Sequence, residues 1–561
     1  MTAVAGIHSP EDRRFVGLAA AAIDDYLARN PVMASRMGDH RFDARLPDLT
    51  ADGVAEQARV LNRHIGALDS LDALSLSRIN GVDITILRSR LAARVFELRT
   101  LAEHTWNPLL WNPGESLEPL LLRESGDPRA QLHAVIERMR ALPEFLDAAR
   151  STLRTMPRIH VEVAVRQAEG LEDIVGVPLD ELMARAPGMH DDVREAREEL
   201  HGAQRDYVRW LRAQIPAATR DPRLGSQMYR AAFRHRFGPG ITPEGLLADA
   251  EAEADRLREE MHGVAARLLG RSMATRRLVP DALTLVAEQA ALSSPDELLP
   301  ATRRALAAAT GFASEHRLLA HVDTDIRVEA MPRVLRGVAV AYCDTPGNLE
   351  PVPAQTRIAV APPLPDWAPS RRQSFLKEYH GVMLDVLMVH EGVPGHAAQL
   401  ARARGAATPT AVRAVFPDSQ FVEGWAVYAE QIMAQQGYVG SMPGVSPHAF
   451  RLLQLKMQLR TVINAILDVR THMEAMAEPQ ARRLLSVQGL QEETEITQKW
   501  QRARLTHGQL STYYAGNRDL RVAVADLSRM HPGWSVGRLH DTVLSHGSVA
   551  PAHLRTLTGL T

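Results

Sequence analysis

The chain has 561 residues, of which 45% are hydrophobic, and it carries 65 Lys and Arg residues against 67 Asp and Glu residues. This length and apolar content predict a globular protein with a large core, and the net charge of −2 indicates neither a nucleic acid nor an anionic membrane as a partner. Because the single Cys343 cannot form an intrachain disulfide, no apolar stretch reaches the length of a membrane span and the N-terminus lacks a signal-peptide pattern, we expect a cytoplasmic protein of undetermined oligomeric state.

The first half of the chain is typical of amphipathic helices that pack on one another. The stretch from Ser9 to Asp12 combines a capping residue, a proline and two acids, so it predicts the start of a helix that continues through Leu27 and ends at Pro31. Leu, Ile, Val and Ala then recur at three- and four-residue spacing between charges. This pattern predicts further helices over residues 52–104, 127–153, 191–214 and 242–269.

The pattern changes to short β-branched stretches separated by Pro and Gly. Residues 326–328, 337–342 and 356–360 predict a small antiparallel sheet within an otherwise helical chain. Such a sheet could offer an edge strand to an extended peptide, or it could only cover one side of the core.

The stretch from His390 to His396 places two imidazoles and a carboxylate within seven residues, directly after an apolar, helix-like run. In the common zinc-protease helix, two histidines four residues apart share one face. Here the fourth residue after His390 is Pro394, and His396 would lie about 120° around a regular helix. Because Pro394 and Gly395 favour a local break, the two histidines could still converge on a divalent metal. The alternative is a helix end with both histidines on the surface.

A second helical pattern follows, with large apolar residues on most positions and two acids seven residues apart. Glu423 and Glu430 therefore share one helix face, where buried carboxylates are costly unless a cation or hydrogen bonds compensate them. Glu423 would supply the third ligand of a His/His/Glu site, and Glu430 would orient a histidine from one layer out. The alternative for Glu430 is a solvated surface acid.

The C-terminal part adds further polar candidates. Asp468 and His472 lie four residues apart on an apolar helix, where they either support the metal site or form an ordinary surface pair. Tyr513 and Tyr514 lie in a segment that mixes aromatic and polar groups, and a tyrosine hydroxyl is a suitable hydrogen-bond donor to an oxyanion. His540 is either structural or catalytic.

Several motifs together carry a family resemblance. They are His390-Glu391-x-x-Pro394-Gly395-His396, Glu423-Gly424-Trp425-Ala426-x-Tyr428-Ala429-Glu430, the Asp468…His472 helix, Gly508-Gln509…Tyr513…Gly516 and His540-Asp541…Gly547. In these positions the chain resembles the bacterial domain-of-unknown-function 885 family, whose members are described as zinc peptidases or hydrolases. The resemblance implies His390, His396 and Glu423 as zinc ligands and Glu391 as the general base. His507, Cys343 and Leu539 depart from the family pattern, which suggests a changed substrate with the metal chemistry intact.

The fold expected from these observations is mostly α-helical, two-lobed and metallopeptidase-like, with a small antiparallel sheet beside the metal site. We place an N-terminal helical lobe at residues 1–310 and a catalytic lobe at residues 311–561. The predicted function is a hydrolase, most simply a peptidase, that uses zinc or another divalent transition metal to cleave peptide or similar amide bonds. The alternatives are a specialised hydrolase or tailoring enzyme for a small amide or ester, and a non-catalytic binding protein stabilised by a metal.

Each candidate residue then has one predicted role. Glu391 is the base, Tyr513 with Tyr514 as its substitute stabilises the oxyanion, and His540 is the next candidate for proton transfer. Supporting positions around the metal are predicted for Glu430, Asp468 and His472, and substrate-binding positions for Arg502, Gln509 and Tyr342.

Overall fold

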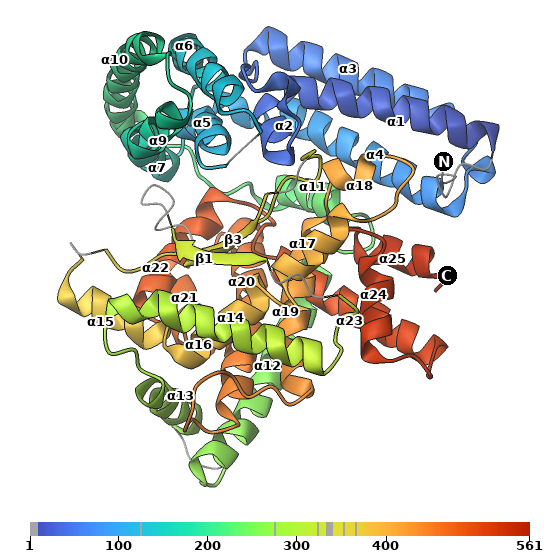
Figure 1. Cartoon of the computed structure of the whole chain (residues 1–561), viewed down its shortest axis with the longest axis vertical. Coiled ribbons are helices and arrows are strands. Elements are labelled where there is room, and N and C mark those ends of the chain that lie inside the picture. Colours follow the sequence, from blue (N-terminus) through green and yellow to red (C-terminus); the bar gives the residue numbers. More distant parts are fainter. Residues whose placement is uncertain are drawn as a thin grey trace. The chain divides into compact units, whose positions relative to one another are not determined.

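The computed structural model describes residues 9–123, 126–273, 277–321, 325–331, 340–351, 354–364 and 367–560. Over these residues the chain is mostly helical and carries one small three-stranded sheet (Figure 1). The predicted fold class of a mostly α-helical chain with a small sheet is therefore confirmed. In this part of the chain, none of the helices is both long and apolar enough to cross a membrane.

The chain divides into two compact units. Unit 1 comprises residues 1–222 with two later segments, 346–354 and 408–416, and unit 2 comprises the remainder. This division differs from the predicted lobes, because the predicted boundary at 310/311 lies inside a helix of unit 2, α14 (Leu298–Glu315). Hydrophobic periodicity shows where a helix forms, but it does not show which other helix covers its apolar face.

Unit 1 is a helical body whose first helix begins as the sequence predicts. The hydroxyl of Ser9 accepts a hydrogen bond from the backbone of Asp12, and the Asp12 carboxylate accepts one from the backbone of Ser9, so the first turn is capped from both sides. The helices of unit 1 are α1 (Pro10–Arg29), α2 (Pro31–Met37), α3 (Ala51–Asp69), α4 (Arg78–Phe96), α5 (Pro113–Leu121), α6 (Pro128–Thr152), α7 (Arg158–Glu169), α8 (Leu171–Ile174), α9 (Val177–Arg185), α10 (His190–Gln214) and α18 (Val412–Val415).

A buried ion pair attaches the late segment 408–416 to unit 1. The Nε atom of Arg413 lies 2.6 Å from an oxygen of Asp83 on α4, and the hydroxyl of Thr410 donates to the other oxygen at 2.8 Å. A buried charge is tolerated only when it is paired in this way. The contact joins residues more than three hundred positions apart, which explains why the sequence pattern did not reveal it.

Unit 2 contains the sheet and all the residues that the sequence marks for chemistry. Its remaining helices are α11 (Ser226–Phe237), α12 (Pro243–Leu269), α13 (Leu278–Gln289), α15 (Pro369–Glu378), α16 (Gly381–Glu391), α17 (His396–Arg404), α19 (Ser419–Gln435), α20 (Ala449–Met473), α21 (Glu478–Arg483), α22 (Glu493–Leu505), α23 (Thr512–Met530), α24 (Val536–Leu544) and α25 (Pro551–Thr558). Helix α16 is buried on all sides before His390, where its residues are apolar except Asp385, and it packs against α14, α19 and α20 in the core of the unit.

The sheet is mixed, and the prediction of an antiparallel sheet is wrong in this respect. Its strands are β1 (Ile326–Ala330), β2 (Ala341–Asp344) and β3 (Thr356–Val360), in the order β1-β3-β2. Strand β3 pairs in parallel with β1 and antiparallel with β2. The chain forms β2 after β1 and then returns to place β3 between these two strands. The connection from β1 to β3 is therefore long enough for the two strands to run parallel. Residues 337–339 of the second predicted strand lie outside the described residues.

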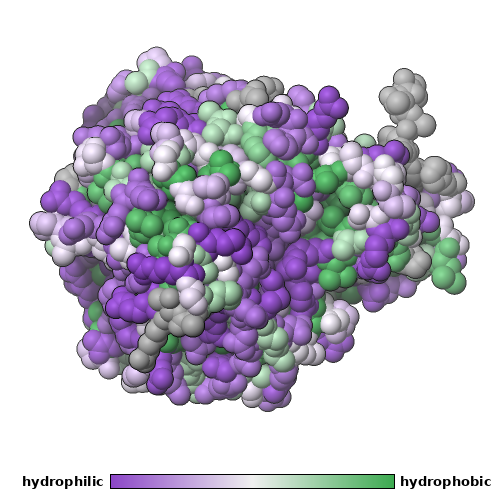
Figure 2. All heavy atoms as spheres, turned by 90° about the horizontal axis from the view of Figure 1, so that it is seen from below, coloured by the Kyte–Doolittle hydropathy of each residue, from purple (hydrophilic) through white to green (hydrophobic). Residues whose placement is uncertain are grey.

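The surface is predominantly polar where it is displayed. On the face shown in Figure 2, hydrophilic residues alternate with small groups of hydrophobic ones. This distribution is ordinary for a globular chain whose large apolar side chains fill its interior.

Candidate metal centre

The two histidines of the central motif lie on either side of a helix break. Helix α16 ends at Glu391 and α17 begins at His396, with Gly392 to Gly395 between them. A Cβ atom on Gly395 would collide with the carbonyl oxygen of His390, so only glycine permits the chain to turn this closely. The indole Nε1 of Trp425 on α19 donates to the carbonyl of Pro394 at 2.8 Å, and this hydrogen bond ties the turn to α19. The predicted local break is therefore present.

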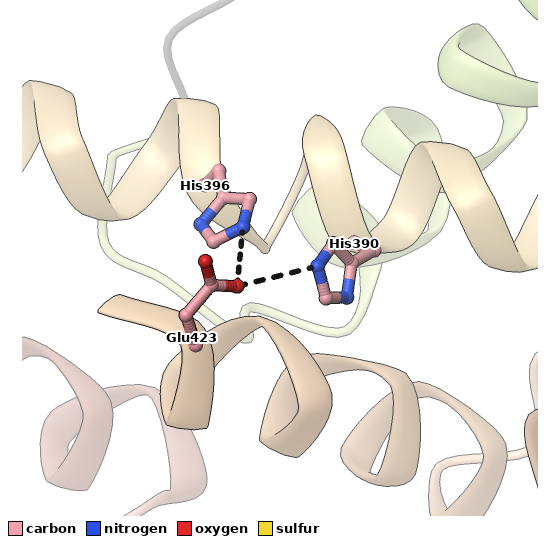
Figure 3. Close-up of side chains that lie close together, drawn as sticks. All are labelled: His390, His396 and Glu423. Atoms are coloured by element: carbon pink, nitrogen blue, oxygen red, sulfur yellow. Dashed lines mark ion pairs between the residues drawn. The ribbon is translucent and has the colours of Figure 1, made fainter. Parts of the chain in front are cut away.

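The break brings both imidazoles onto one carboxylate. Figure 3 shows His390 and His396 converging on Glu423 from α19, with the Nε2 atoms 4.0 and 3.6 Å from the same carboxylate oxygen. One possible ligand atom from each of the three side chains lies within 4.8 Å of the others. These separations exceed the 2.7–3.2 Å of a hydrogen bond. They suit three ligands that share an ion, as zinc bound to nitrogen and oxygen at about 2 Å requires.

Glu430 occupies the second layer, as the helix spacing predicts. It lies two turns after Glu423 on α19 and is 1% exposed, and its carboxylate lies 2.7 Å from the Nδ1 atom of His390. A carboxylate at this position fixes Nδ1 as the protonated nitrogen and leaves Nε2 free as a ligand. The alternative of a solvated Glu430 is excluded by its burial. In contrast, the buried Nδ1 of His396 has no hydrogen-bond partner among the described residues.

Glu391 adjoins the cluster, and a residue of the sheet forms a hydrogen bond with its carboxylate. The backbone N–H of Cys343 on β2 donates to its carboxylate at 3.0 Å. Burial raises the pKa of Glu391 above its ordinary value, and it outweighs the opposing effect of the His390 and His396 charges. A carboxylate with a raised pKa next to three possible metal ligands is a suitable proton acceptor.

The charges in the cluster act strongly on one another in the metal-free protein. Burial works to lower the pKa of His390, but Glu430, Glu391 and Glu423 outweigh burial and raise this pKa to about 9. Burial works to raise the pKa of Glu423, but the imidazoles of His396 and His390 and the guanidinium of Arg502 hold it below its ordinary value. A divalent cation would replace the proton on the imidazole as the partner of Glu423.

Tyr513 lies beside the cluster together with two of the predicted substrate-binding residues. Arg502 on α22 donates to its hydroxyl at 3.4 Å, and the side chain of Gln509 also interacts with this hydroxyl. Burial and the charge of Glu423 raise the pKa of Tyr513 to about 12, so the phenol keeps its proton and can donate a hydrogen bond. Helix α23, which carries Tyr513, crosses α19 at close range.

The other predicted tyrosines lie elsewhere. The charges that act on Tyr514 come from Glu253 and Asp249 on α12 and from Arg518 and Arg521, so it faces α12 rather than the cluster. Adjacent helix positions differ by about 100° in direction, which makes Tyr514 unsuitable as a substitute for Tyr513. Tyr342 lies on β2 of the sheet, where it packs on the small apolar group of Met331, Ala359 and Ala361.

Asp468 and His472 are buried, but each supports the backbone rather than a liganding histidine. Asp468 accepts hydrogen bonds from the backbone of Gly508 and from the backbone and hydroxyl of Ser511, which fixes the turn before α23. His472 contacts the carbonyl oxygen of Thr506 at 2.9 Å and stacks on Tyr229. Both residues therefore position the segment that carries Tyr513, one step further from the cluster than predicted.

His540 is a structural residue in this geometry. Its Nδ1 donates to the carbonyl of Leu318 at 2.8 Å, so its Nε2 accepts from the hydroxyl of Tyr428 at 3.0 Å, and the ring is 1% exposed. Burial lowers its pKa to about 4, so it stays neutral. With both nitrogens engaged and its ring against Trp425, it supports α19 and does not suit the role of alternative base.

The motif search did not single out Lys499, which the structure places near the cluster. Lys499 is 8% exposed and lies one turn before Arg502 on α22, and the charges of Glu423 and Arg502 both act on it. The available signal was the spacing of Glu495, Lys499 and Arg502, which puts all three on one helix face.

Two solved structures share the fold over nearly the whole chain. One is a putative lipoprotein of unknown function from Shewanella oneidensis, with 24% identity, a TM-score of 0.79 and coverage of 97% of this chain and 99% of that one. The other is a putative lipoprotein from Colwellia psychrerythraea, with 15% identity, a TM-score of 0.80 and coverage of 98% and 99%. No curated protein matches the sequence.

These likenesses contradict one expectation from the sequence. Both of these proteins are described as putative lipoproteins, so the prediction of a cytoplasmic location is wrong on this finding. The amino-acid composition and the first residues of the chain do not suffice to predict where the protein is located.

The family model described as "Bacterial protein of unknown function (DUF885)" matches residues 31–557, which include every residue of the candidate centre. The chain therefore belongs to the DUF885 family of bacterial proteins of unknown function.

Proposed function

We propose that this protein is a zinc-dependent hydrolase that cleaves peptide or similar amide bonds. The observation that carries the proposal is the convergence of His390, His396 and Glu423 on one point, with Glu430 behind His390. Three protein ligands are typical of catalytic zinc sites, whereas structural sites usually have four. Within the described part of the chain, the group that could hold a metal consists of these three side chains.

Zinc held by these residues would supply a Lewis acid that polarises a carbonyl and lowers the pKa of water. The residues of the chain account for the proton transfers. Glu391 would accept the proton of the attacking water and then donate it to the leaving nitrogen, so it ends the cycle as a carboxylate. Its raised pKa suits both steps.

Tyr513 would stabilise the oxyanion that forms when water attacks the carbonyl. Its hydroxyl keeps its proton at neutral pH, and the charge of Glu423 acts on it. Asp468 fixes the turn that precedes α23, so the phenol is positioned before substrate binds. A preorganised donor of this kind contributes about 2.7–4 kcal/mol to a transition state.

The sheet favours a peptide among the possible amide substrates. Strand β2 lies at the edge of the sheet, and its residue Cys343 contacts Glu391. An extended peptide that paired with this edge would pass directly beside the proposed base. A small ester or amide would make no use of an edge strand.

The test is hydrolysis of a panel of peptides, amides and esters by the purified protein before chelation, after chelation and after zinc is restored. We expect peptide cleavage that chelation abolishes and zinc restores. His396→Asn should lose both stoichiometric zinc and activity, whereas His190→Asn, at an exposed position on α10, should keep both. Activity that survives chelation, or a zinc-loaded protein that cleaves nothing in the panel, would contradict the proposal.

A further inference from the structure

One face of α22 leads from a buried ion pair towards the candidate metal centre. Glu495, Lys499 and Arg502 lie at spacings of four and three residues and therefore share this face. Glu495 lies 2.8 Å from a guanidinium nitrogen of Arg460 on α20 and accepts a hydrogen bond from Tyr379 at 3.0 Å. The negative charge of Glu495 is thus already matched.

Lys499, the next residue along this face, is buried without a partner. Its side chain forms no hydrogen bond and no ion pair within 4.0 Å among the residues that the structure describes. Burial lowers its pKa well below the ordinary value, and the nearby guanidinium groups of Arg460 and Arg502 lower it further. An amine with so little access to water and no counter-charge is costly, so its presence calls for a partner that arrives from outside.

The neighbouring acids are already committed. Of the carboxylates that act most strongly on Lys499, Glu495 is paired with Arg460, and Glu423 faces the two histidines. Lys456 on α20 forms its own ion pair with Glu378 at 2.8 Å. Among the residues that the structure describes, Lys499 and Arg502 therefore remain as two basic groups without an ion pair to a carboxylate.

Arg502 brings this positive charge to the reacting position. It donates to the hydroxyl of Tyr513, and its charge acts on Glu423. A substrate group next to Arg502 would thus lie close to the bond that the proposed chemistry breaks. A guanidinium with an ammonium beside it is suited to a carboxylate, because both supply charged hydrogen-bond donors.

We propose that Lys499 and Arg502 bind a carboxylate of the substrate and thereby select peptides that present one next to the cleaved bond. This inference rests on the proposed hydrolase function. The carboxylate could be the C-terminus of the peptide, which would make the enzyme act at chain ends, or an acidic side chain. In either case the substrate carboxylate would lie beside Lys499 and supply the negative charge that this residue lacks.

Three short-peptide libraries distinguish the two sources. The first has free C-termini, the second has the same sequences with amidated C-termini and no acidic residue, and the third is amidated but contains one glutamate at a varied position. The zinc-loaded full chain is compared with Lys499→Met, Arg502→Met and the control Lys377→Met, whose side chain is 53% exposed on α15.

We expect wild type to cleave the free-acid or the glutamate library at least about 10-fold faster than the neutral amidated one. Each of Lys499→Met and Arg502→Met should reduce this preference about 10- to 100-fold, as the loss of a charged hydrogen bond predicts. Lys377→Met should keep the wild-type preference. Equal cleavage of all three libraries by wild type, or an unchanged preference in both binding-site variants, would overturn the inference.

A binding measurement separates this inference from the proposed function. Isothermal titration of metal-free protein with N-acetyl-leucine, N-acetyl-leucinamide and the amide of N-acetyl-glutamate reports carboxylate recognition without catalysis. Selective binding of an acid that both variants lose would support the inference even if no library is cleaved, in which case only the hydrolase function fails. No selectivity for either acid in wild type would overturn the inference even if peptides are cleaved.

Folding of the variants is checked by thermal unfolding followed by circular dichroism. Because Lys499→Met removes an amine without a counter-charge from a largely buried side chain and keeps its apolar stem, we expect no loss of melting temperature. If Lys499→Met nevertheless fails to fold, Arg502→Met alone decides the result, since Arg502 is only partly buried.

Discussion

The contact between Glu430 and His390 allows a quantitative test of the candidate centre. In Glu430→Gln the side chain keeps its size and an acceptor for the Nδ1 hydrogen, but it loses its charge. Partners of liganding histidines typically contribute 10- to 100-fold to metal affinity. We therefore expect zinc to bind the variant about 10- to 100-fold more weakly once no proton competes for His390.

Proton competition makes this difference depend on pH. In wild type the pKa of His390 is raised to about 9. At pH 7, which is about two units below this pKa, zinc must displace a proton from the imidazole. This displacement costs about 100-fold in apparent affinity, and it disappears as the pH rises above 9. Without the Glu430 charge, the effect of burial should lower the pKa of His390, so a proton competes less strongly with zinc in the variant at pH 7.

The assay is competition with a chromogenic zinc chelator at pH 7 and at pH 9.5, with Glu315→Gln at an exposed position on α14 as the control. We expect the full deficit of Glu430→Gln at pH 9.5 and a much smaller deficit at pH 7. An affinity at pH 9.5 equal to that of wild type, or a deficit of the same size at both pH values, would refute the reasoning.

Two further predictions concern the helix that carries the cluster. Asp385 on α16 is fully buried, and burial raises its pKa to about 6 from an ordinary 3.8. Because the folded state holds this proton more tightly, the stabilisation is present below pH 3.8 and is lost as the pH rises through 6. The free energy of unfolding of wild type, measured with urea relative to Asp385→Asn, should therefore fall by about 2–3 kcal/mol between pH 4 and 6.5, and a constant difference would contradict this cause. Gly395→Ala should lose zinc while the chain stays folded, because the added Cβ would push the turn away from the His390 carbonyl and separate the histidines. Zinc retention by Gly395→Ala, measured by metal analysis after gel filtration, would show that the turn tolerates the change.

The helices could be predicted closely from local sequence patterns. The expected helix over 191–214 is observed as His190–Gln214, and that over 242–269 as Pro243–Leu269 with Thr242 as its cap. Both are long amphipathic segments whose ends carry their own signals.

Tertiary arrangement was less accessible from the sequence. The pairing of Arg413 with Asp83 draws a short late segment into unit 1, and no local pattern announces a contact of that range. The parallel pairing of β1 with β3 is another such case, because strand signals give the strands but not their order.

Within the candidate centre, spacing predicted proximity best where residues share one helix. Glu423 and Glu430 lie on one face of α19 as expected, and the break at Gly395 brings the histidines together. Asp468 and His472 also share a helix face, but the Nε2 atom of His472 lies 3.9 Å from the Asp468 carboxylate, and each side chain has backbone partners from other elements. Partners from distant segments decide the role of a buried polar residue, and these partners are not visible in a local pattern.

The paired measurement of zinc content and turnover in Glu391→Gln tests the central claim most directly. If Glu391 transfers the proton and the other three residues hold the metal, the variant should keep zinc near one equivalent while kcat on a cleaved peptide falls about 100- to 10,000-fold. Glutamine keeps an acceptor for the Cys343 N–H, so the local structure should persist. Loss of zinc from Glu391→Gln, or full zinc content with undiminished kcat, would contradict the account.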